Sequence, residues 1–184
     1  MGSTLDCRNS PRLRYNVFKG ENLGRRMADQ STFQCSLTDT WHLNNRVNLR
    51  LLDALTDRQL AATILPRGKE VASYFAHIHM ARFYWLERRA GALAKGLKKI
   101  PAGTATRAVL RQALIDSGEA MGELFAEAER TGRIKGTKIG PVGFLGYTLA
   151  HEGHHRGQIL LHLKIAKLPL DRATSYSLWY WNKI

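Results

Sequence analysis

Apolar residues recur every three to four positions through most of the chain, a spacing typical of amphipathic helices. In one such segment Tyr74, Ile78, Ala81 and Trp85 fall on a single stripe, which predicts a core-facing surface. The pattern predicts four long helices, at about residues 40–55, 69–93, 104–130 and 141–167. Thr40 is a suitable residue to cap the first of them. Four helices with short connections and no β-hairpin signal predict an all-α protein, a four-helix bundle.

The two ends of the chain differ from this pattern. Residues 1–38 are rich in Ser, Asn, Arg and Gly without a sustained period, so we expect a flexible, basic N-terminal tail. Residues 39–184 then form the bundle, with Met27 as an alternative true start. The aromatic C-terminal sequence SYSLWYWNKI is expected to pack back over the bundle, and a short exposed strand is the alternative.

Composition narrows the class of protein. With 184 residues and 44% hydrophobic content, the chain is expected to form one globular domain. Its apolar runs are too short to span a membrane. Cys7 and Cys35 form neither a metal motif nor a disulfide framework, which favours a cytoplasmic protein. The net charge of +13 is spread along the chain, so we expect a solvated basic surface or affinity for small anions. Contact with nucleic acid is the less favoured alternative.

The candidate chemistry lies in LAHEGHHRGQILLHLK, near the C-terminal end, which contains four histidines. On a helix, His151, His155, Gln158 and His162 share one narrow face, and His154 lies at its edge. The i, i+4 spacing of His151 and His155 allows two imidazoles to bind one metal ion. The same spacing is also typical of a solvated helix face, and both interpretations stay open at this point.

Other polar residues bear on that choice. HEGHH fits the HExxH motif of zinc proteases, with Glu152 as the general base. Asn44 and Asn48 interrupt the apolar stripe of the first helix, and His77 and His79 flank that of the second. Buried polar groups need partners, and convergence on one metal or ligand pocket would satisfy several of them together.

Three segments together resemble the DinB-like proteins, the damage-inducible superfamily that includes bacillithiol transferases and mycothiol-dependent maleylpyruvate isomerases. They are WHLNNRVNLRLLDAL (41–55), YFAHIHMARFYWLE (74–87) and AHEGHHRGQI (150–159). The resemblance covers about residues 39–184 and implies a metal-dependent helical bundle. Many such proteins dimerise, so we also expect a homodimer.

The resemblance implies a metal site of three histidines, with zinc or nickel as the expected ion. Carried over, the ligands are His151 and His155, with His77 as the third and His79 as its rival. Both rivals lie about 100° from the centre of the apolar stripe, so helix geometry does not choose between them. In this family the HExxH match is coincidental, and Glu152 belongs to the helix.

Four further residues are candidates for the surroundings of that site. Gln158 and His162 share the face of the histidine pair, and Asn44 and Asn48 either line a pocket or bond helix to helix. His154 is expected to face outward.

The resemblance also implies an activity. Three imidazoles leave coordination positions open, which is the layout of a catalytic site. We expect a metal-dependent thiol S-transferase or hydrolase acting on a small molecule, with a low-molecular-weight thiol presented by the metal as a thiolate. Arg82 or Arg156 could hold carboxylates of that thiol. The alternatives are a non-catalytic metal-binding stress-response bundle and, less favoured, a basic bundle that binds nucleic acid.

Overall fold

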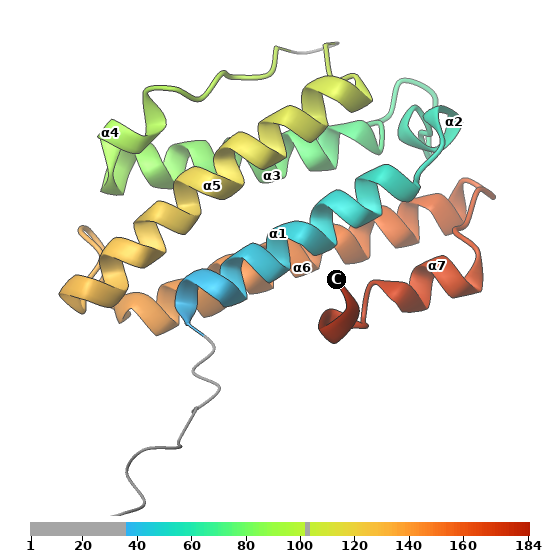
Figure 1. Cartoon of the computed structure of the whole chain (residues 1–184). Helices are drawn as coiled ribbons and strands as arrows, with labels where there is room; N and C mark the ends of the chain where they lie inside the picture. Colours follow the sequence, from blue (N-terminus) through green and yellow to red (C-terminus); the bar gives the residue numbers. More distant parts are fainter. Residues whose placement is uncertain (1–35, 102–103) are drawn as a thin grey trace, which may run out of the picture. The chain divides into compact units, whose positions relative to one another are not determined.

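The computed structural model describes residues 36–101 and 104–184, and in this part of the chain all regular structure is helical (Figure 1). The four long helices are α1 (Leu37–Ala54), α3 (Ala72–Arg89), α5 (Arg107–Thr131) and α6 (Gly140–Ile165). Shorter elements are α2 (Asp57–Leu60), α4 (Gly91–Ala94), α7 (Arg172–Ser177) and the 3-10 turn η1 (Trp181–Lys183). The predicted all-α bundle is confirmed. The tail predicted for residues 1–38 falls mostly outside the described residues.

The first helix begins earlier than the sequence pattern predicted, and Thr40 does not cap it. Ser36 is the N-cap, and its hydroxyl accepts a hydrogen bond of 2.9 Å from the backbone N–H of Asp39. The Thr40 hydroxyl instead donates to the carbonyl of Ser36 at 2.9 Å. Ser and Thr are both good N-cap residues. Ser36 is the cap here because the helix extends further towards the N-terminus than the apolar pattern indicated.

The directions of the four long helices require one long connection. In Figure 1, α1 and α6 run one way along the bundle, and α3 and α5 run the other way. The connection from α4 to α5, residues 95–106, therefore crosses back along the bundle, so the prediction of short connections is wrong here. A chain of that length can span up to about 40 Å. Helix α3, with 18 residues, is about 27 Å long.

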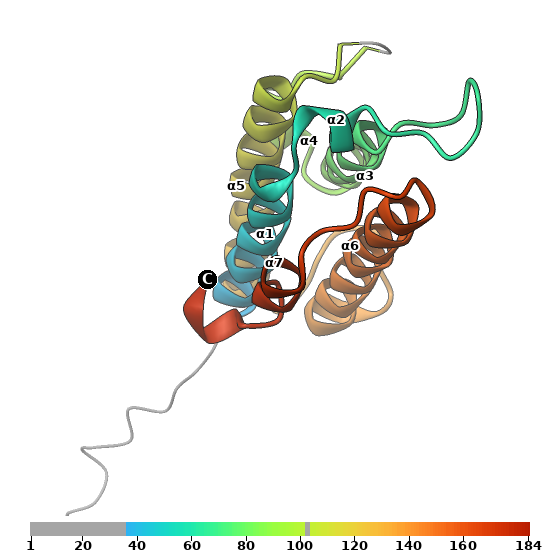
Figure 2. The ribbon, with the colours of Figure 1, turned by 90° about the vertical axis from the view of Figure 1, so that its right-hand side faces the viewer.

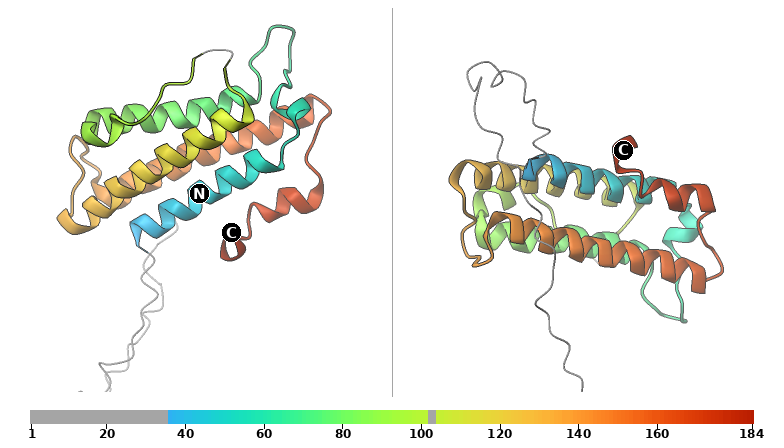
Figure 3. Two further views of the ribbon diagram at one scale, coloured as in Figure 1. Left: turned by 45° about the horizontal axis from the view of Figure 1, so that its top comes forward. Right: turned by 90° about the horizontal axis from the view of Figure 1, so that it is seen from below.

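The long helices surround a common core. In the end-on view of Figure 2, α1 and α3 each lie between α5 and α6. The C-terminal segment with α7 lies beside α1 and α6 (Figures 2 and 3). Leu178 is buried there, and Trp181 and Ile184 pack against the core, which confirms that the aromatic end returns to the bundle. No strand forms among the residues described, and none of the helices there is long and apolar enough to cross a membrane.

The core consists of two apolar clusters. The α2-end cluster includes Leu51, Phe75, Leu114 and Ile159. The α4-end cluster includes Trp41, Leu86, Phe125 and Phe144. Along every long helix the two clusters are separated by buried polar residues, which we call the polar layer: Asn44, Asn45, Asn48, Arg82, Ser117 and Glu152. The asparagines that interrupt the stripe of the first helix therefore belong to a layer shared by all four helices.

Candidate metal centre

Three histidines from two helices meet at the surface between α3 and α6. His77 of α3 and His151 and His155 of α6 each offer one ring nitrogen, and these atoms lie within 4.8 Å of one another. His77 is exposed, His151 is half-buried and His155 is buried. The group therefore has a protected inner side and an outer side open to solvent, and we call it the histidine cluster.

The spacing within the histidine cluster suits one metal ion. The Nε2 atoms of His151 and His155 lie 3.2 Å apart. Two imidazole ligands of a tetrahedral Zn²⁺, each at about 2.05 Å, would have their nitrogens about 3.3 Å apart. The ring of His77 completes the group, with centroid distances of 5.5 Å to His151 and 4.6 Å to His155. The His151–His155 pair therefore fits a divalent ion as it stands, and the ligand atom of His77 lies within 4.8 Å of both.

Gln158 orients the buried member of the cluster. Its Oε1 lies 2.7 Å from Nδ1 of His155. An amide oxygen only accepts, so Nδ1 of His155 carries the proton and donates it to Gln158. In the neutral ring this leaves the lone pair on Nε2, the atom that faces His151. Gln158, a predicted neighbour of the site, thus fixes the tautomer that a metal ion needs.

The surroundings keep the three imidazoles neutral. Burial, with repulsion from His151 and His77, lowers the pKa of His155 to about 4. Burial also lowers the pKa of His151, helped by the neighbouring His77. For His77, burial and the nearby ammonium of Lys69 both lower the pKa. Near pH 7 all three rings are therefore free of the extra proton that would compete with a metal.

Aromatic side chains form the walls beside the histidine cluster. On one side the Tyr74 ring lies 6.3 Å from that of His155, and the Lys69 ammonium stands 4.4 Å from the Tyr74 centroid. On the other side the Trp85 ring lies 5.1 Å from that of His151. The sequence pattern assigned Tyr74 and Trp85 to the core stripe, but both are only half-buried. In the sequence, the one indication that Tyr74 and Trp85 flank the site was their position close to His77 on the same helix.

The structure separates the two candidates on the second helix. His79 is buried, with Nδ1 3.0 Å from the carbonyl oxygen of Ala113 and Nε2 2.8 Å from that of Lys98. Both of its nitrogens are engaged by backbone, and it does not join the histidine cluster. His77 joins the cluster instead.

The remaining histidines of α6 also lie outside the cluster. His154 is exposed, as its position at the edge of the helix face predicted. His162 is buried, and its ring meets the Tyr74 ring edge-on at 5.8 Å between centroids. Among the described residues, neither ring nitrogen of His162 has a hydrogen-bond partner of ordinary geometry. His162 therefore packs behind Tyr74, one step removed from the ligand atoms.

Glu152 points away from the histidines into the polar layer. Its two carboxylate oxygens accept hydrogen bonds of 2.7 and 2.9 Å from Nε and Nη2 of Arg82. The side-chain amides of Asn44 and Asn48 each donate to the same carboxylate at 2.6 Å. Burial raises the pKa of Glu152, but the attraction and hydrogen bonds of Arg82, together with Asn48 and Arg156, lower it by more, so this pKa lies below its ordinary value. A carboxylate held in this way cannot serve as the general base of an HExxH protease.

Asn44, Asn48 and Arg82 of the polar layer are not part of the histidine cluster, and neither is Arg156. Besides Glu152, Asn44 and Asn48 bind Arg156, whose Nη1 donates to their side-chain oxygens at 2.9 and 2.7 Å. Their role is helix-to-helix hydrogen bonding, one of the two interpretations open from the sequence. Arg82 is fully buried and occupied by Glu152, so the expectation that it could hold carboxylates of a cofactor is wrong.

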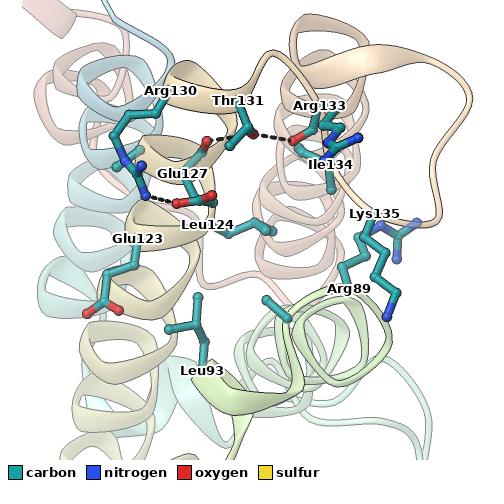
Figure 4. Close-up of a pocket in the computed structure, with 12 residues that line it drawn as sticks. Arg89, Leu93, Glu123, Leu124, Glu127, Arg130, Thr131, Arg133, Ile134 and Lys135 are labelled. Carbon is teal, nitrogen blue, oxygen red and sulfur yellow. Dashed lines mark hydrogen bonds and ion pairs between the residues drawn. The ribbon is translucent and has the colours of Figure 1, made fainter.

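A hollow lies near the C-terminal end of α3, as Figure 4 shows. It has a volume of about 570 Å³ and is lined by both cations and carboxylates, among them Arg89, Glu123 and Lys135. Glu127 and Arg130 on its rim form an ion pair with each other. None of the cluster histidines lines this hollow, so it contributes nothing to the candidate metal centre.

The fold and the site together define a class: an all-helical bundle in which two long helices bring three histidines to a group that could hold a metal ion. The chain belongs to the DinB family, whose family model matches residues 27–166. That match includes residues 27–38, which the sequence pattern assigned to the tail. No curated protein and no solved structure showed significant similarity to the chain.

Proposed function

We propose that His77, His151 and His155 bind one divalent metal ion, zinc or nickel, and that the protein is a metal-dependent enzyme acting on a small molecule. The reaction proposed is transfer of a low-molecular-weight thiol to an electrophile, or hydrolysis. The observation that carries the proposal is the meeting of three neutral ring nitrogens within 4.8 Å at an open surface. Membership of the DinB family supports it.

The chain's own residues would hold and shape the site. Gln158 fixes the ring of His155, while the exposed edge at His77 leaves one side open for substrate. The rings of Tyr74 and Trp85 flank the cluster on either side. A bound divalent ion supplies Lewis acidity, which lowers the pKa of a coordinated thiol or water. Because all three candidate ligands are uncharged, the charge of the ion would be balanced by the group it receives.

Metal analysis of the purified protein tests the site. We expect one equivalent of divalent metal per chain in the wild type, measured by inductively coupled plasma mass spectrometry. His77→Ala, His151→Ala and His155→Ala should each reduce this content at least tenfold, since each removes one of three ligands. His154→Ala is the matched control, because His154 is exposed on the same helix outside the histidine cluster. Full metal content in His151→Ala and His155→Ala would overturn the site.

A second experiment separates an enzyme from a non-catalytic metal-binding protein. The metal-loaded wild type is mixed with a small thiol and a soluble electrophile, and with hydrolysable esters and amides, and turnover is compared with chelated protein. We expect turnover that depends on the metal and is lost in His77→Ala. Stoichiometric metal without turnover of either class would favour the non-catalytic alternative. Turnover unaffected by chelation would contradict the enzyme proposal.

A further inference from the structure

A second hollow is lined by residues of α1, α6 and the C-terminal segment. These three segments lie side by side in Figures 2 and 3. Its volume is about 210 Å³, and its apolar walls include Val47, Leu160, Leu178 and Trp181. We call it the C-terminal pocket. None of the cluster histidines lines it, so it is separate from the candidate metal centre.

Two glycines keep the C-terminal pocket open. Gly153 and Gly157 lie four residues apart inside α6 and both line the pocket. A Cβ atom added at Gly157 would meet nothing within 4 Å, and one at Gly153 would meet only Nη2 of Arg156, at 3.6 Å. Alanine at such a helical position would favour the helix by about 1 kcal/mol. These glycines therefore do not serve the stability of the helix. Their lack of side chains leaves space free in the C-terminal pocket.

Arg156 places an incompletely used guanidinium at the wall of this pocket. Its Nη1 donates both protons to the side-chain oxygens of Asn44 and Asn48. Within the described part of the chain, its Nε and Nη2 donate to no protein acceptor. Nη2 lies beside Gly153, which itself lines the pocket. The unused edge, Nε with Nη2, is the same edge through which Arg82 holds the carboxylate of Glu152.

The charges around Arg156 do not balance. Two guanidinium groups, Arg82 and Arg156, act on a single buried carboxylate, Glu152. Arg82 forms the direct ion pair with that carboxylate. Glu152 attracts Arg156, and Arg82 repels it. One positive charge is thus left over at the wall of an otherwise apolar pocket, and an anion is the partner that would compensate it.

We propose that the C-terminal pocket binds a small organic carboxylate with an apolar, aromatic or branched body. The carboxylate would take the Nε and Nη2 edge of Arg156 in the bidentate geometry that guanidinium and carboxylate share. The body would lie against the aliphatic walls and the indole rings of Trp179 and Trp181. The volume is below the usual range for drug-sized ligands, which limits the body to about one ring.

Calorimetric titration with benzoate tests this pocket. We expect one saturable site per chain with a dissociation constant below about 1 mM. Benzamide keeps the ring but lacks the charge, and acetate keeps the charge but lacks the ring. Each should bind at least tenfold more weakly. Absence of saturable benzoate binding in the wild type would overturn the proposal, as would equal binding of benzamide.

Two variants then locate the site. Gly157→Leu fills the pocket from a position with free space around it, and should weaken benzoate binding at least tenfold. Arg156→Gln removes the charge and should weaken binding about 10- to 100-fold. If Arg156→Gln fails to fold, the Gly157→Leu result still decides. Benzoate affinity unchanged by Gly157→Leu would overturn the assignment.

The metal centre provides the control for position, since a carboxylate could also bind a metal ion. Benzoate binding should be the same in His77→Ala and in chelated wild type. Loss of binding in either would place benzoate at the histidine cluster and overturn the proposal. The C-terminal pocket does not depend on the proposed enzyme activity.

Discussion

Arg82 and Glu152 are both fully buried, and each is the other's main partner. Two desolvated charges of this kind contribute little net stability as a pair. Removing Glu152 alone leaves the charge of Arg82 in the core without a counter-charge, although Arg82 keeps its hydrogen bonds to Asn45 and to the Leu114 carbonyl. The guanidinium of Arg82 also lies 4.8 Å from the centroid of the Trp41 ring, so Arg82 contacts the α4-end cluster as well.

Glu152→Gln should therefore lower the free energy of unfolding by about 3–5 kcal/mol, because Arg82 would remain charged and buried. Asp53→Asn is the matched control: it breaks the ion pair with Arg111, in which both side chains are nearly half exposed. We expect the control to cost less than about 1 kcal/mol. Urea denaturation measures both. Similar losses in the two variants would contradict the role assigned to Glu152.

His162 gives a pH dependence whose sign can be stated. Burial holds its pKa below the ordinary value, although the nearby Ala62 backbone favours the charged form slightly. As pH falls, the unfolded chain takes up this proton first, so stability is lost below about pH 6.5. At pH 5.5 the loss from this residue is at most about 1.4 kcal/mol.

The comparison is between wild type and His162→Leu, by urea denaturation at pH 7.5 and pH 5.5. The other histidines are common to both proteins, so their contributions cancel in the difference. We expect the wild type to lose more stability than the variant over this interval. Equal losses would show that His162 is as easily protonated in the folded protein as in the unfolded chain.

Helix geometry alone did not distinguish His77 from His79, and the choice of His77 came from the resemblance to the DinB-like proteins. Both flank the apolar stripe of α3 at similar angles, and a single helix contains no further information. His79 is excluded by carbonyl groups of Ala113 and Lys98, which belong to α5 and to the connection after α4. Such tertiary partners are not encoded in local spacing.

At the scale of elements, the polar layer specifies how the helices align along the bundle. A slip of one helical turn, about 5.4 Å, would move the Arg82 charge against apolar side chains. The layer also requires α1 and α5 to approach closely. The Trp41 indole donates to the Gly118 carbonyl at 2.8 Å, and Asn45 packs on the same glycine.

Gly118→Ala tests that close approach. The added Cβ would lie 2.1 Å from Nδ2 of Asn45, whose Oδ1 accepts a hydrogen bond of 2.9 Å from Arg82. Relief of the clash would disturb that bond, so we expect destabilisation of about 1–3 kcal/mol. Gly146→Ala is the control, since its Cβ meets nothing within 4 Å and should stabilise α6 by up to about 1 kcal/mol. Thermal unfolding that ranks the two variants alike would contradict this account.

The four long helices were predictable to within a few residues, because each buries a periodic apolar face. The crossover of residues 95–106 was not. Its direction depends on which faces of α3 and α5 meet, and that is a contact between distant parts of the sequence. Similarly, the docking of Leu178 on the core followed from its aromatic neighbourhood, but the short helix α7 before it did not.

At the scale of the whole molecule, a metal ion bound at the histidine cluster would link α3 to α6. A ligand that binds only the folded protein stabilises it by about 2.7 kcal/mol at a hundred times its dissociation constant. For a chain of this size we expect a rise in melting temperature of about 5–10 °C on addition of zinc or nickel. Calorimetry of metal-loaded and chelated protein measures it.

The same shift should be absent in His151→Ala and retained in His154→Ala. If the metal raised the melting temperature of His151→Ala by the same amount, its stabilising site would lie elsewhere on the chain. Absence of a shift in the wild type would contradict metal binding at the histidine cluster.

The division of the core by the polar layer has a kinetic consequence. Each apolar cluster draws on all four long helices, so we expect each half of the bundle to open locally while the other stays closed. Amide hydrogen exchange would then report two cooperative units that divide every long helix near its middle, rather than units that follow whole helices. The boundary between the slow and the fast amides would cross α6 near Glu152, beside the histidine cluster.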